Sequence, residues 1–309
     1  MTPPDLGENA PLFIVLNAGS GHDDAALTRQ SIEAVLDATG RRYLLFQADP
    51  PSGLQALAQQ AVKRARAERG VVVAAGGDGT LNTVAQAVLG SGCAFGVLPQ
   101  GTFNYFGRNH GIPSDTAAAT RLLLSARAQP VQVGLVNESL GLYPQLLEDR
   151  EAWKQQYGRH RLVAFGSALA TLLREHRQLR IRVERAGKAH VVRTPTLFVA
   201  NNRLQLEQIG IEETEALASG RLAAVMPRPV DTLTMRGALG RLGEAEQIDH
   251  FGFTQMTVTP APAFGGYGGQ RLKIATDGEV GWLRAPIEFR VAPEPLWLLK
   301  PDGARGEQA

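Results

Sequence analysis

Short apolar runs alternate with helical patterns along the first hundred residues. The runs lie at 12–16, 43–46, 71–75 and 95–98, and each is apolar at nearly every position. Between them, apolar residues recur at helical spacing across 25–36, 54–66 and 81–89. Strand–helix repeats of this length are typical of a parallel sheet covered by helices on both faces. The sequence therefore predicts an α/β domain over residues 1–131.

The pattern changes after residue 131, where polar and apolar positions begin to alternate. Segments 180–184, 272–274 and 287–291 alternate in this way, which is typical of half-exposed antiparallel strands. Segments 196–200 and 222–226 are more apolar and predict buried strands. We expect a mostly antiparallel β-sandwich domain at 132–309, with the last strand able to return to the first domain. Further predictions are a helix at 162–175 and a long loop at 259–270.

Composition and charge exclude several classes of protein. The 309 residues carry a formal net charge of +2, which is too small for a dedicated nucleic-acid binder. Cys93 is the only cysteine, so no disulfide can form within the chain. Residues 1–10 lack the pattern of a signal peptide, and no apolar stretch approaches the ~18 residues needed to cross a bilayer. We expect a cytoplasmic protein without a transmembrane segment.

The glycine-rich loop after the strand at 71–75 is the most informative motif. It reads Gly76-Gly77-Asp78-Gly79-Thr80 and leads into a helix predicted from Leu81. Anions collect at helix N-termini, and the glycines are expected to allow positive φ and the close approach of a phosphate. A carboxylate beside phosphate requires a divalent cation or a hydroxyl donor between them. The alternative is a structural turn in which Asp78 acts as a helix cap.

Two further loops follow predicted parallel strands. They lie at 17–21 and 100–104, and the second contains the hydroxyl of Thr102 and the amide of Asn104. Ligands bind beyond the carboxyl ends of the strands in such sheets. We therefore expect the three loops to converge on one nucleotide site, with Arg108 available to neutralise a phosphate.

The paired motifs Gly76-Gly77-Asp78-Gly79-Thr80 and Pro99-x-Gly101-Thr102-x-Asn104-x-Phe106 resemble the diacylglycerol kinase catalytic-domain family. The first loop, Asn17-Ala18-Gly19-Ser20-Gly21, is similar to that family's Asn-Pro-x-Ser-Gly. The family includes bacterial soluble lipid kinases and the sphingosine and ceramide kinases. The resemblance implies an α/β nucleotide domain followed by a β-sandwich, and transfer of the γ-phosphoryl group of ATP to a lipid hydroxyl with Mg²⁺.

The resemblance also implies roles for individual residues. Asp78 and Asp277 would be metal ligands. The residues implied in nucleotide binding are Asn17, Ser20, Gly21, Gly76, Gly77, Asp78, Gly79, Thr80, Thr102 and Asn104.

The late motif Asp277-Gly278-Glu279 would supply the catalytic carboxylate. The family assigns the general base to the glutamate, hence Glu279, although the sequence does not separate it from Asp277. Asp-Gly is also a strong hairpin-turn signal, so a simple turn between strands remains the alternative.

Two positions depart from the family pattern. The segment 47–50 lacks a threonine that touches the nucleotide in the family, and Ser219 stands where an aspartate helps to bind a structural Mg²⁺. A hydroxyl is a much weaker ligand for a hard cation than a carboxylate. We therefore do not expect the structural metal site here.

The sequence thus predicts an ATP- and Mg²⁺-dependent lipid kinase, with two alternatives. One is an NAD-kinase-like phosphotransferase for a soluble acceptor, since Asn137-Glu138 matches a pair found in those enzymes. The other is a nucleotide-binding protein that has lost its activity.

A lipid acceptor requires transient docking at a membrane surface. The basic residues between 174 and 193 are one candidate docking face, and an ordinary solvated face is the alternative. No nucleic-acid partner is expected, and homodimerisation is left open.

Overall fold

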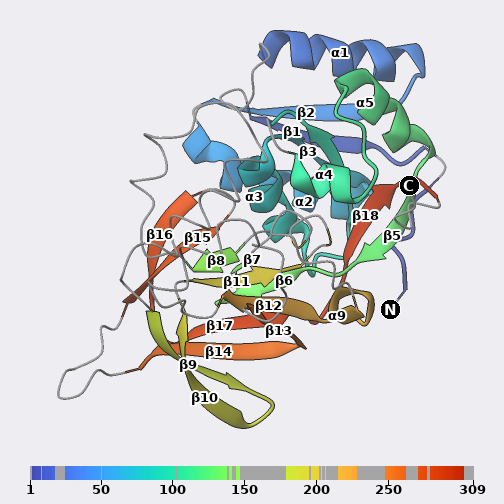
Figure 1. Ribbon diagram of the computed structural model, residues 1–309. Coiled ribbons are helices and arrows are strands. Elements are labelled where there is room, and N and C mark those ends of the chain that lie inside the picture. The colour runs from blue at the N-terminus through green and yellow to red at the C-terminus, as the bar shows by residue number, and fades with distance from the viewer. Residues whose placement is uncertain are drawn as a thin grey trace, which may run out of the picture. The chain divides into compact units, whose positions relative to one another are not determined.

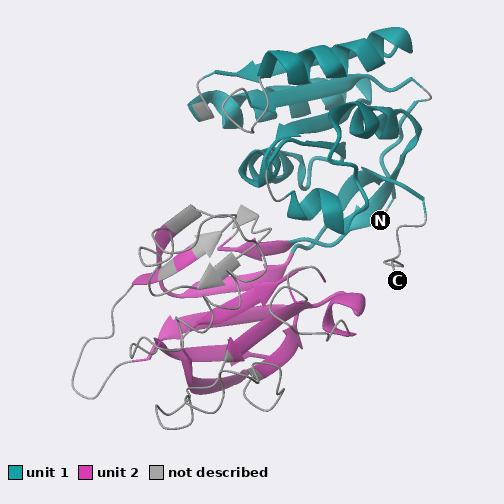
Figure 2. Cartoon of the chain, turned by 45° about the horizontal axis from the view of Figure 1, so that its top comes forward, with its two compact units in different colours: residues 1–133, 292–309 teal, residues 134–291 magenta. Residues whose placement is uncertain are grey.

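The computed structural model describes residues 2–7, 9–17, 25–49, 51–101, 104–137, 139–140, 144–146, 179–194, 196–201, 203, 206, 215–227, 248–261, 271–276 and 279–302. The chain forms two compact units (Figure 2). Unit 1 comprises Met1–Val133 with Ala292–Ala309, and unit 2 comprises Gly134–Val291. The division thus follows Val133, whereas the sequence placed it after residue 131 and assigned 132–309 to the second domain, with the last strand able to return to the first.

Unit 1 is built on a six-stranded sheet with the order β2-β1-β3-β4-β18-β5 (Figure 1). Strands β1 to β4 are parallel, and β18 runs parallel to β4 and antiparallel to β5. All residues of β3 and β4 are buried, which explains their uniformly apolar sequences. The strands are β1 (Leu12–Asn17), β2 (Tyr43–Ala48), β3 (Val71–Gly76), β4 (Ala94–Pro99), β5 (Arg127–Val131) and β18 (Leu296–Lys300).

Helices cover this sheet in pairs. α1 packs against α5, and α2 packs against α3. The predicted strand–helix alternation is therefore present in unit 1. The helices are α1 (Ala25–Ala38), α2 (Leu54–Glu68), α3 (Asp78–Val88), α4 (Tyr105–Asn109) and α5 (Thr116–Ser125), with a 3-10 turn η1 at Pro51–Gly53.

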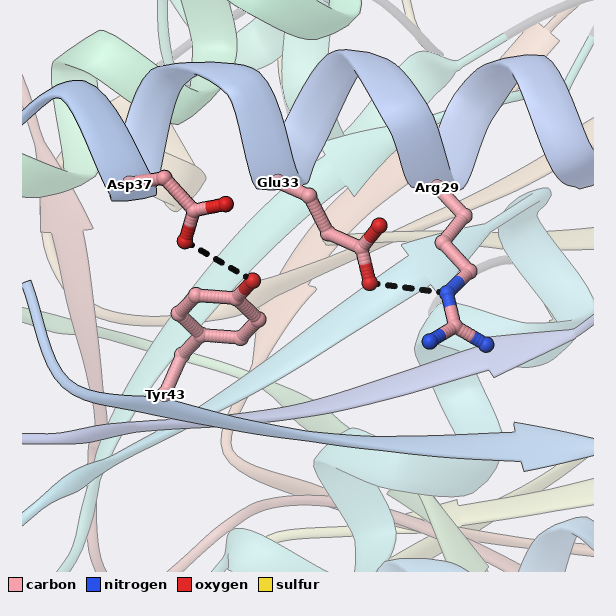
Figure 3. Close-up of polar contacts among 4 residues, drawn as sticks. All are labelled: Arg29, Glu33, Asp37 and Tyr43. Atoms are coloured by element: carbon pink, nitrogen blue, oxygen red, sulfur yellow. Dashed lines mark hydrogen bonds and ion pairs between the residues drawn. The ribbon is translucent and has the colours of Figure 1, made fainter.

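Polar contacts tie the outer surface of α1 to the neighbouring strand β2 (Figure 3). Arg29 Nε donates to Glu33 Oε1 over 2.8 Å within the helix, and the Tyr43 hydroxyl donates to Asp37 Oδ1 over 3.1 Å. Burial and the bond to Asp37 raise the pKa of Tyr43. Exposed pairs of this kind contribute little stability, so α1 is held chiefly by its buried residues Ile32 and Leu36.

Unit 2 contains two six-stranded sheets, with the orders β10-β9-β14-β17-β6-β7 and β13-β12-β11-β8-β15-β16. Every described pairing in them is antiparallel. One core cluster joins Ile181 and Phe289 of the first sheet to Leu197, Phe253 and Ile274 of the second. The two sheets thus pack face to face, and the predicted class of an α/β domain with an antiparallel β-sandwich is confirmed.

Strands β9, β11, β12, β15 and β17 overlap the five segments that the sequence predicted as strands, and the other strands of unit 2 were not predicted. Of the predicted loop at 259–270, Thr259 and Pro260 belong to β14, and residues 262–270 lie outside the described part, as does the predicted helix at 162–175. The elements are β6 (Gly134–Val136), β7 (Ser139–Leu140), β8 (Pro144–Leu146), β9 (Leu179–Arg185), β10 (Lys188–Thr194), β11 (Leu197–Ala200), α9 (Glu215–Ala218), β12 (Leu222–Pro227), β13 (Ile248–Phe253), β14 (Gln255–Pro260), β15 (Arg271–Thr276), β16 (Glu279–Arg284) and β17 (Ile287–Val291).

None of the helices that the structure describes is both long and apolar enough to cross a bilayer.

Candidate functional site

The carboxyl ends of β1, β3 and β4 lie side by side at one edge of the unit 1 sheet. The strands end at Asn17, Gly76 and Pro99, and Gly76 is the register partner of Pro99. Because β1 lies between β2 and β3, the chain reverses its direction of winding here, which is where doubly wound sheets bind ligands. The structure therefore places Asn17, Gly76–Thr80 and Asn104 at one sheet edge, at the ends of strands and the starts of helices. Ser20, Gly21 and Thr102 lie outside the described residues.

A hydrogen bond links the end of β1 to the first turn of α3. Asn17 Nδ2 donates to Thr80 Oγ1 over 2.9 Å, and Thr80 is only 4% exposed. Both side chains were predicted to contact the nucleotide. Their mutual bond spans the point where the winding reverses and fixes the two loops relative to each other.

The helix after the glycine-rich motif begins earlier than its sequence predicts. α3 starts at Asp78, so the predicted start at Leu81 is wrong. Glycine is a poor helix former, which hides the first turn from a periodicity argument, whereas an acidic residue there is favoured by the helix dipole. The N-cap, Gly77, makes no side-chain capping bond. Glycine has no side chain that could cap the first N–H groups of α3. N–H groups without a side-chain cap at a helix N-terminus suit anion binding.

The glycines of the motif serve close packing rather than unusual backbone angles. Gly76, Gly77 and Gly79 all lack positive φ, so the expected role in permitting it is wrong. A Cβ at Gly76 would lie 2.5 Å from Thr80 Cβ, and a Cβ at Gly101 would lie 2.9 Å from Gly77 Cα. A side chain at Gly76 would thus clash with Thr80 of the same motif, and one at Gly101 would clash with the neighbouring loop at Gly77. Gly79, by contrast, faces open space.

Asn104 shapes the loop after β4. It adopts the left-handed conformation, with φ 48° and ψ 41°, and its Oδ1 accepts the Gly101 N–H over 2.8 Å. The residue is 8% exposed and forms the N-cap of α4. Asparagine tolerates this conformation better than most residues. Its amide group is therefore engaged in holding the loop, besides any contact with a ligand.

Gln100 is a positioning residue that the sequence did not reveal. Its N–H donates to Gly76 O over 2.9 Å, and its side-chain Nε2 donates to Thr116 Oγ1 over 2.9 Å. Its Oε1 accepts from Thr28 Oγ1 over 3.2 Å. One side chain thus anchors the loop to both α1 and α5. Gln100 occupies an unspecified position of the family motif, so no sequence signal marked it.

Asp78 lies between the two glycine-containing loops. Its Oδ1 is buried and has no hydrogen-bond partner within the described part of the chain. Burial raises the pKa of Asp78, and the backbone N–H groups of Phe106, Tyr105 and Asn104 oppose that rise. The carboxylate therefore faces the start of α4 while one oxygen remains available. An unpartnered buried carboxylate oxygen suits a divalent cation.

We expect Asp78→Asn to stabilise unit 1, or to leave its stability unchanged, at neutral pH. Because burial raises the pKa of Asp78 above its ordinary value of 3.8, the folded state holds the carboxyl proton more tightly than the unfolded state. Protonation therefore stabilises the fold fully below pH 3.8, and this stabilisation is lost as the pH rises through the pKa of the folded state. Asparagine removes the cost of burying the charge. Melting temperatures of both proteins between pH 3 and 8 test this, and the difference should shrink toward low pH. A clearly lower melting temperature of the variant at pH 7 would instead indicate a structural cap.

The late motif lies in unit 2, on the hairpin formed by β15 and β16. Thr276 pairs with Glu279, so Asp277 and Gly278, which lie outside the described residues, join two adjacent antiparallel strands. This pairing is what the turn interpretation requires, and it also presents Glu279 at the start of β16. Both roles are compatible with the same hairpin, so the catalytic assignment stays a prediction.

Ser219 makes contacts that do not suit a metal site. Its Oγ donates to Ala216 O over 2.9 Å and accepts from Arg221 Nε over 2.9 Å. The Arg221 guanidinium group thus lies within hydrogen-bond distance of the Ser219 hydroxyl, where a positive charge disfavours a cation ligand role for Ser219. Among the described residues, no group of three or more His, Cys, Asp or Glu side chains is arranged to hold a metal ion. The described residues around Ser219 therefore do not fit a structural Mg²⁺.

Asn137 is used by the strand pairing of unit 2. Its N–H donates to Glu288 O over 2.9 Å, and its Oδ1 accepts the Glu288 N–H over 2.7 Å. It has a φ of 46° and follows β6. This structural role accounts for Asn137 without a soluble acceptor, and it weakens the argument for an NAD-kinase-like enzyme.

Comparison with known proteins identifies the α/β part of the chain. Residues 11–136 match the family described as "Diacylglycerol kinase catalytic domain", which confirms the resemblance carried by the two motifs. A Klebsiella pneumoniae protein named "Probable lipid kinase YegS-like" is 46% identical over 72 residues, which cover 23% of this chain and 24% of that protein. The "Diacylglycerol kinase" of Staphylococcus haemolyticus is 29% identical over 126 residues, covering 40% and 37%. These matches span well under half of either relative.

The fold similarity extends over nearly the whole chain. The crystal structure of a diacylglycerol kinase from Bacillus anthracis superposes with a TM-score of 0.67 and covers 95% of this chain and 97% of that one. The identity is 16%, so this likeness establishes the fold alone.

Proposed function

We propose, from the premise that residues 11–136 form a domain of the diacylglycerol kinase catalytic family, that this chain is an ATP- and Mg²⁺-dependent lipid kinase. It would transfer the γ-phosphoryl group to a lipid hydroxyl such as that of diacylglycerol. The observation that carries the proposal is the packing of Gly76, Gly77 and Gly101 around an α3 N-terminus whose N-cap lacks a side chain. This arrangement admits phosphate at the sheet edge where ligands bind.

The described residues of unit 1 have distinct parts in the proposed site. The N–H groups in the first turn of α3 would bind phosphate oxygens, and Asp78 Oδ1 would be a Mg²⁺ ligand. Mg²⁺ would supply charge neutralisation at the phosphates. The bond between Asn17 and Thr80 and the contacts of Gln100 would hold the loops in place, since phosphoryl transfer depends chiefly on positioning.

The proposed chemistry needs one base on this chain. The acceptor hydroxyl oxygen bonds to the γ-phosphorus, and the bond from that phosphorus to the bridging oxygen of ADP breaks. The hydroxyl proton passes to the carboxylate of Glu279, with Asp277 as the neighbouring metal-associated carboxylate. The products are a lipid phosphate and ADP. Because the acceptor resides in a membrane, the enzyme would work transiently at the membrane surface.

The proposal is tested by offering the purified chain Mg²⁺ and ATP labelled at the γ-phosphate. The acceptors are diacylglycerol, sphingosine, other lipid alcohols and NAD, each with an EDTA control. We expect label in a lipid product and none after chelation. Label in NAD with none in any lipid would replace this proposal by the soluble-acceptor alternative. ATP binding without any product would favour a protein that has lost its activity.

A further inference from the structure

Trp282 is an exposed tryptophan on an edge strand of unit 2. It is 62% exposed, and β16 is the last strand of the sheet β13-β12-β11-β8-β15-β16. The other large hydrophobic side chains exposed among the described residues, Leu27, Leu44 and Val191, are aliphatic. Scattered aliphatic side chains are ordinary on a surface, but exposing an indole ring leaves a large apolar area in water. The neighbours of Trp282 indicate what could cover it.

The strand register surrounds Trp282 with basic positions. Leu272 and Ile274 of β15 lie in the sandwich core, and Leu283 packs against it, so the alternation of strand residues turns Trp282 outward. Trp282 pairs with Lys273, and Arg284 pairs with Arg271. Both arginines are exposed. We call Trp282, Arg271 and Arg284 the Trp282 face.

The Trp282 face contains no acidic residue. Its members, Arg271, Trp282 and Arg284, are all exposed. Cationic side chains around an indole ring complement a surface that is anionic and offers an apolar layer beneath its charges. A bilayer with anionic headgroups has both properties, because tryptophan prefers the headgroup level and basic residues are attracted to the negative surface potential.

We propose that the Trp282 face docks onto anionic lipid membranes, with the Trp282 ring at the headgroup level. The choice of a lipid surface as the partner rests on the proposed function. The face belongs to the same hairpin that carries Asp277-Gly278-Glu279, so docking there would hold that hairpin at the layer that contains the acceptor.

The hairpin of β9 and β10 is a weaker candidate for the same role. Arg180 and Arg182 of β9 share an outward face with Glu184, and Arg182 Nη2 lies 3.7 Å from Glu184 Oε2. This ion pair offsets part of the positive charge, and the exposed apolar residue there is Val191 rather than an aromatic one. The described part of the basic run anticipated from the sequence, residues 180–193, is therefore partly neutralised, and it lacks an exposed tryptophan.

Fluorescence of Trp282 tests the docking directly. The chain contains three tryptophans, so the double variant Trp153→Phe/Trp297→Phe leaves Trp282 as the only one. With vesicles of phosphatidylglycerol and phosphatidylcholine, we expect its emission to shift to shorter wavelength and to be quenched by lipids brominated near the headgroup. Vesicles of pure phosphatidylcholine should cause little change, and added salt should reverse the shift. Emission unchanged by anionic vesicles would overturn the proposal.

Vesicle sedimentation of otherwise unchanged full-length variants provides the second measurement. Trp282→Ala should weaken binding to anionic vesicles by about tenfold, and Arg271→Gln and Arg284→Gln by about fivefold each. The matched controls are Val191→Ala and the pair Arg180→Gln/Arg182→Gln, which should have a smaller effect. Equal loss from the controls, or loss of a dimer rather than of vesicle binding in Trp282→Ala, would contradict docking through this face.

The two proposals fail in different ways. Vesicle binding requires no ATP and no turnover, so it can be positive even if no lipid product is formed. If lipid is phosphorylated but Trp282→Ala binds vesicles normally, the docking face is wrong and the kinase proposal stands. With a short-chain diacylglycerol dispersed below its micelle concentration, Trp282→Ala should retain wild-type turnover, since no surface is then needed.

Discussion

Glu279→Gln is expected to lower the rate of phosphoryl transfer to the lipid by ~10²-fold or more, as loss of a general base commonly does. Glutamine keeps the size of the side chain at the start of β16 but cannot accept the hydroxyl proton at neutral pH. Because the proposed phosphate-binding loops belong to unit 1, ATP binding should remain close to that of the wild type. Asp277→Asn should also reduce turnover, with a stronger dependence on the Mg²⁺ concentration if its carboxylate is metal-associated.

The measurement is kcat with saturating ATP and acceptor, together with ATP affinity from calorimetry. Glu184→Gln is a matched control, because it removes an exposed carboxylate from another strand of the same unit. Its turnover should be unchanged. Near-normal rates in both Glu279→Gln and Asp277→Asn would show that Asp277-Gly278-Glu279 is only a turn.

Gly77→Val is expected to abolish ATP binding while the chain remains folded. Gly77 has φ −78° and ψ 179°, which any residue can adopt, and a Cβ there would meet only Gly101 Cα, at the ordinary distance of 3.5 Å. The backbone thus tolerates a side chain. A branched one would nevertheless occupy the space in front of the α3 N-terminus that we assign to phosphate. Gly77→Ala should give an intermediate loss of affinity.

Calorimetric titration with Mg²⁺-ATP and a thermal unfolding curve separate binding from folding in these variants. Gly53→Ala is the matched control: it too lies at a helix N-cap, and a Cβ there would meet no heavy atom within 4 Å. It should bind ATP normally. A folded Gly77→Val protein with wild-type affinity would remove the glycine-rich turn from the nucleotide site.

Local sequence patterns were sufficient for strands β1 to β4 and for helices α1 to α3 of unit 1, except for the start of α3. β-branched and other apolar residues fill β1 and β3, because strands buried on both faces exclude polar side chains. The motif residues Asn17 and Asp78 could be placed at one sheet edge from order alone, since parallel strands end on the same side. These conclusions depend on residues close together in the chain, where periodicity and turn chemistry act directly.

The sequence by itself therefore determined the two architectures, the edge where the loops meet and the resemblance to the diacylglycerol kinase catalytic-domain family. Only the tertiary structure decided what each residue does there, because packing joins segments that local propensity treats separately. In the folded chain, α3 begins at Asp78, and Gly76 and Gly101 permit close contacts rather than positive φ. Gln100 anchors the loop after β4 through its side-chain hydrogen bonds. The tertiary structure also placed β18 in the first sheet, a return for which the sequence had allowed, and it paired Ser219 with Arg221. Each of these outcomes depends on distances between parts of the folded chain that no local pattern encodes.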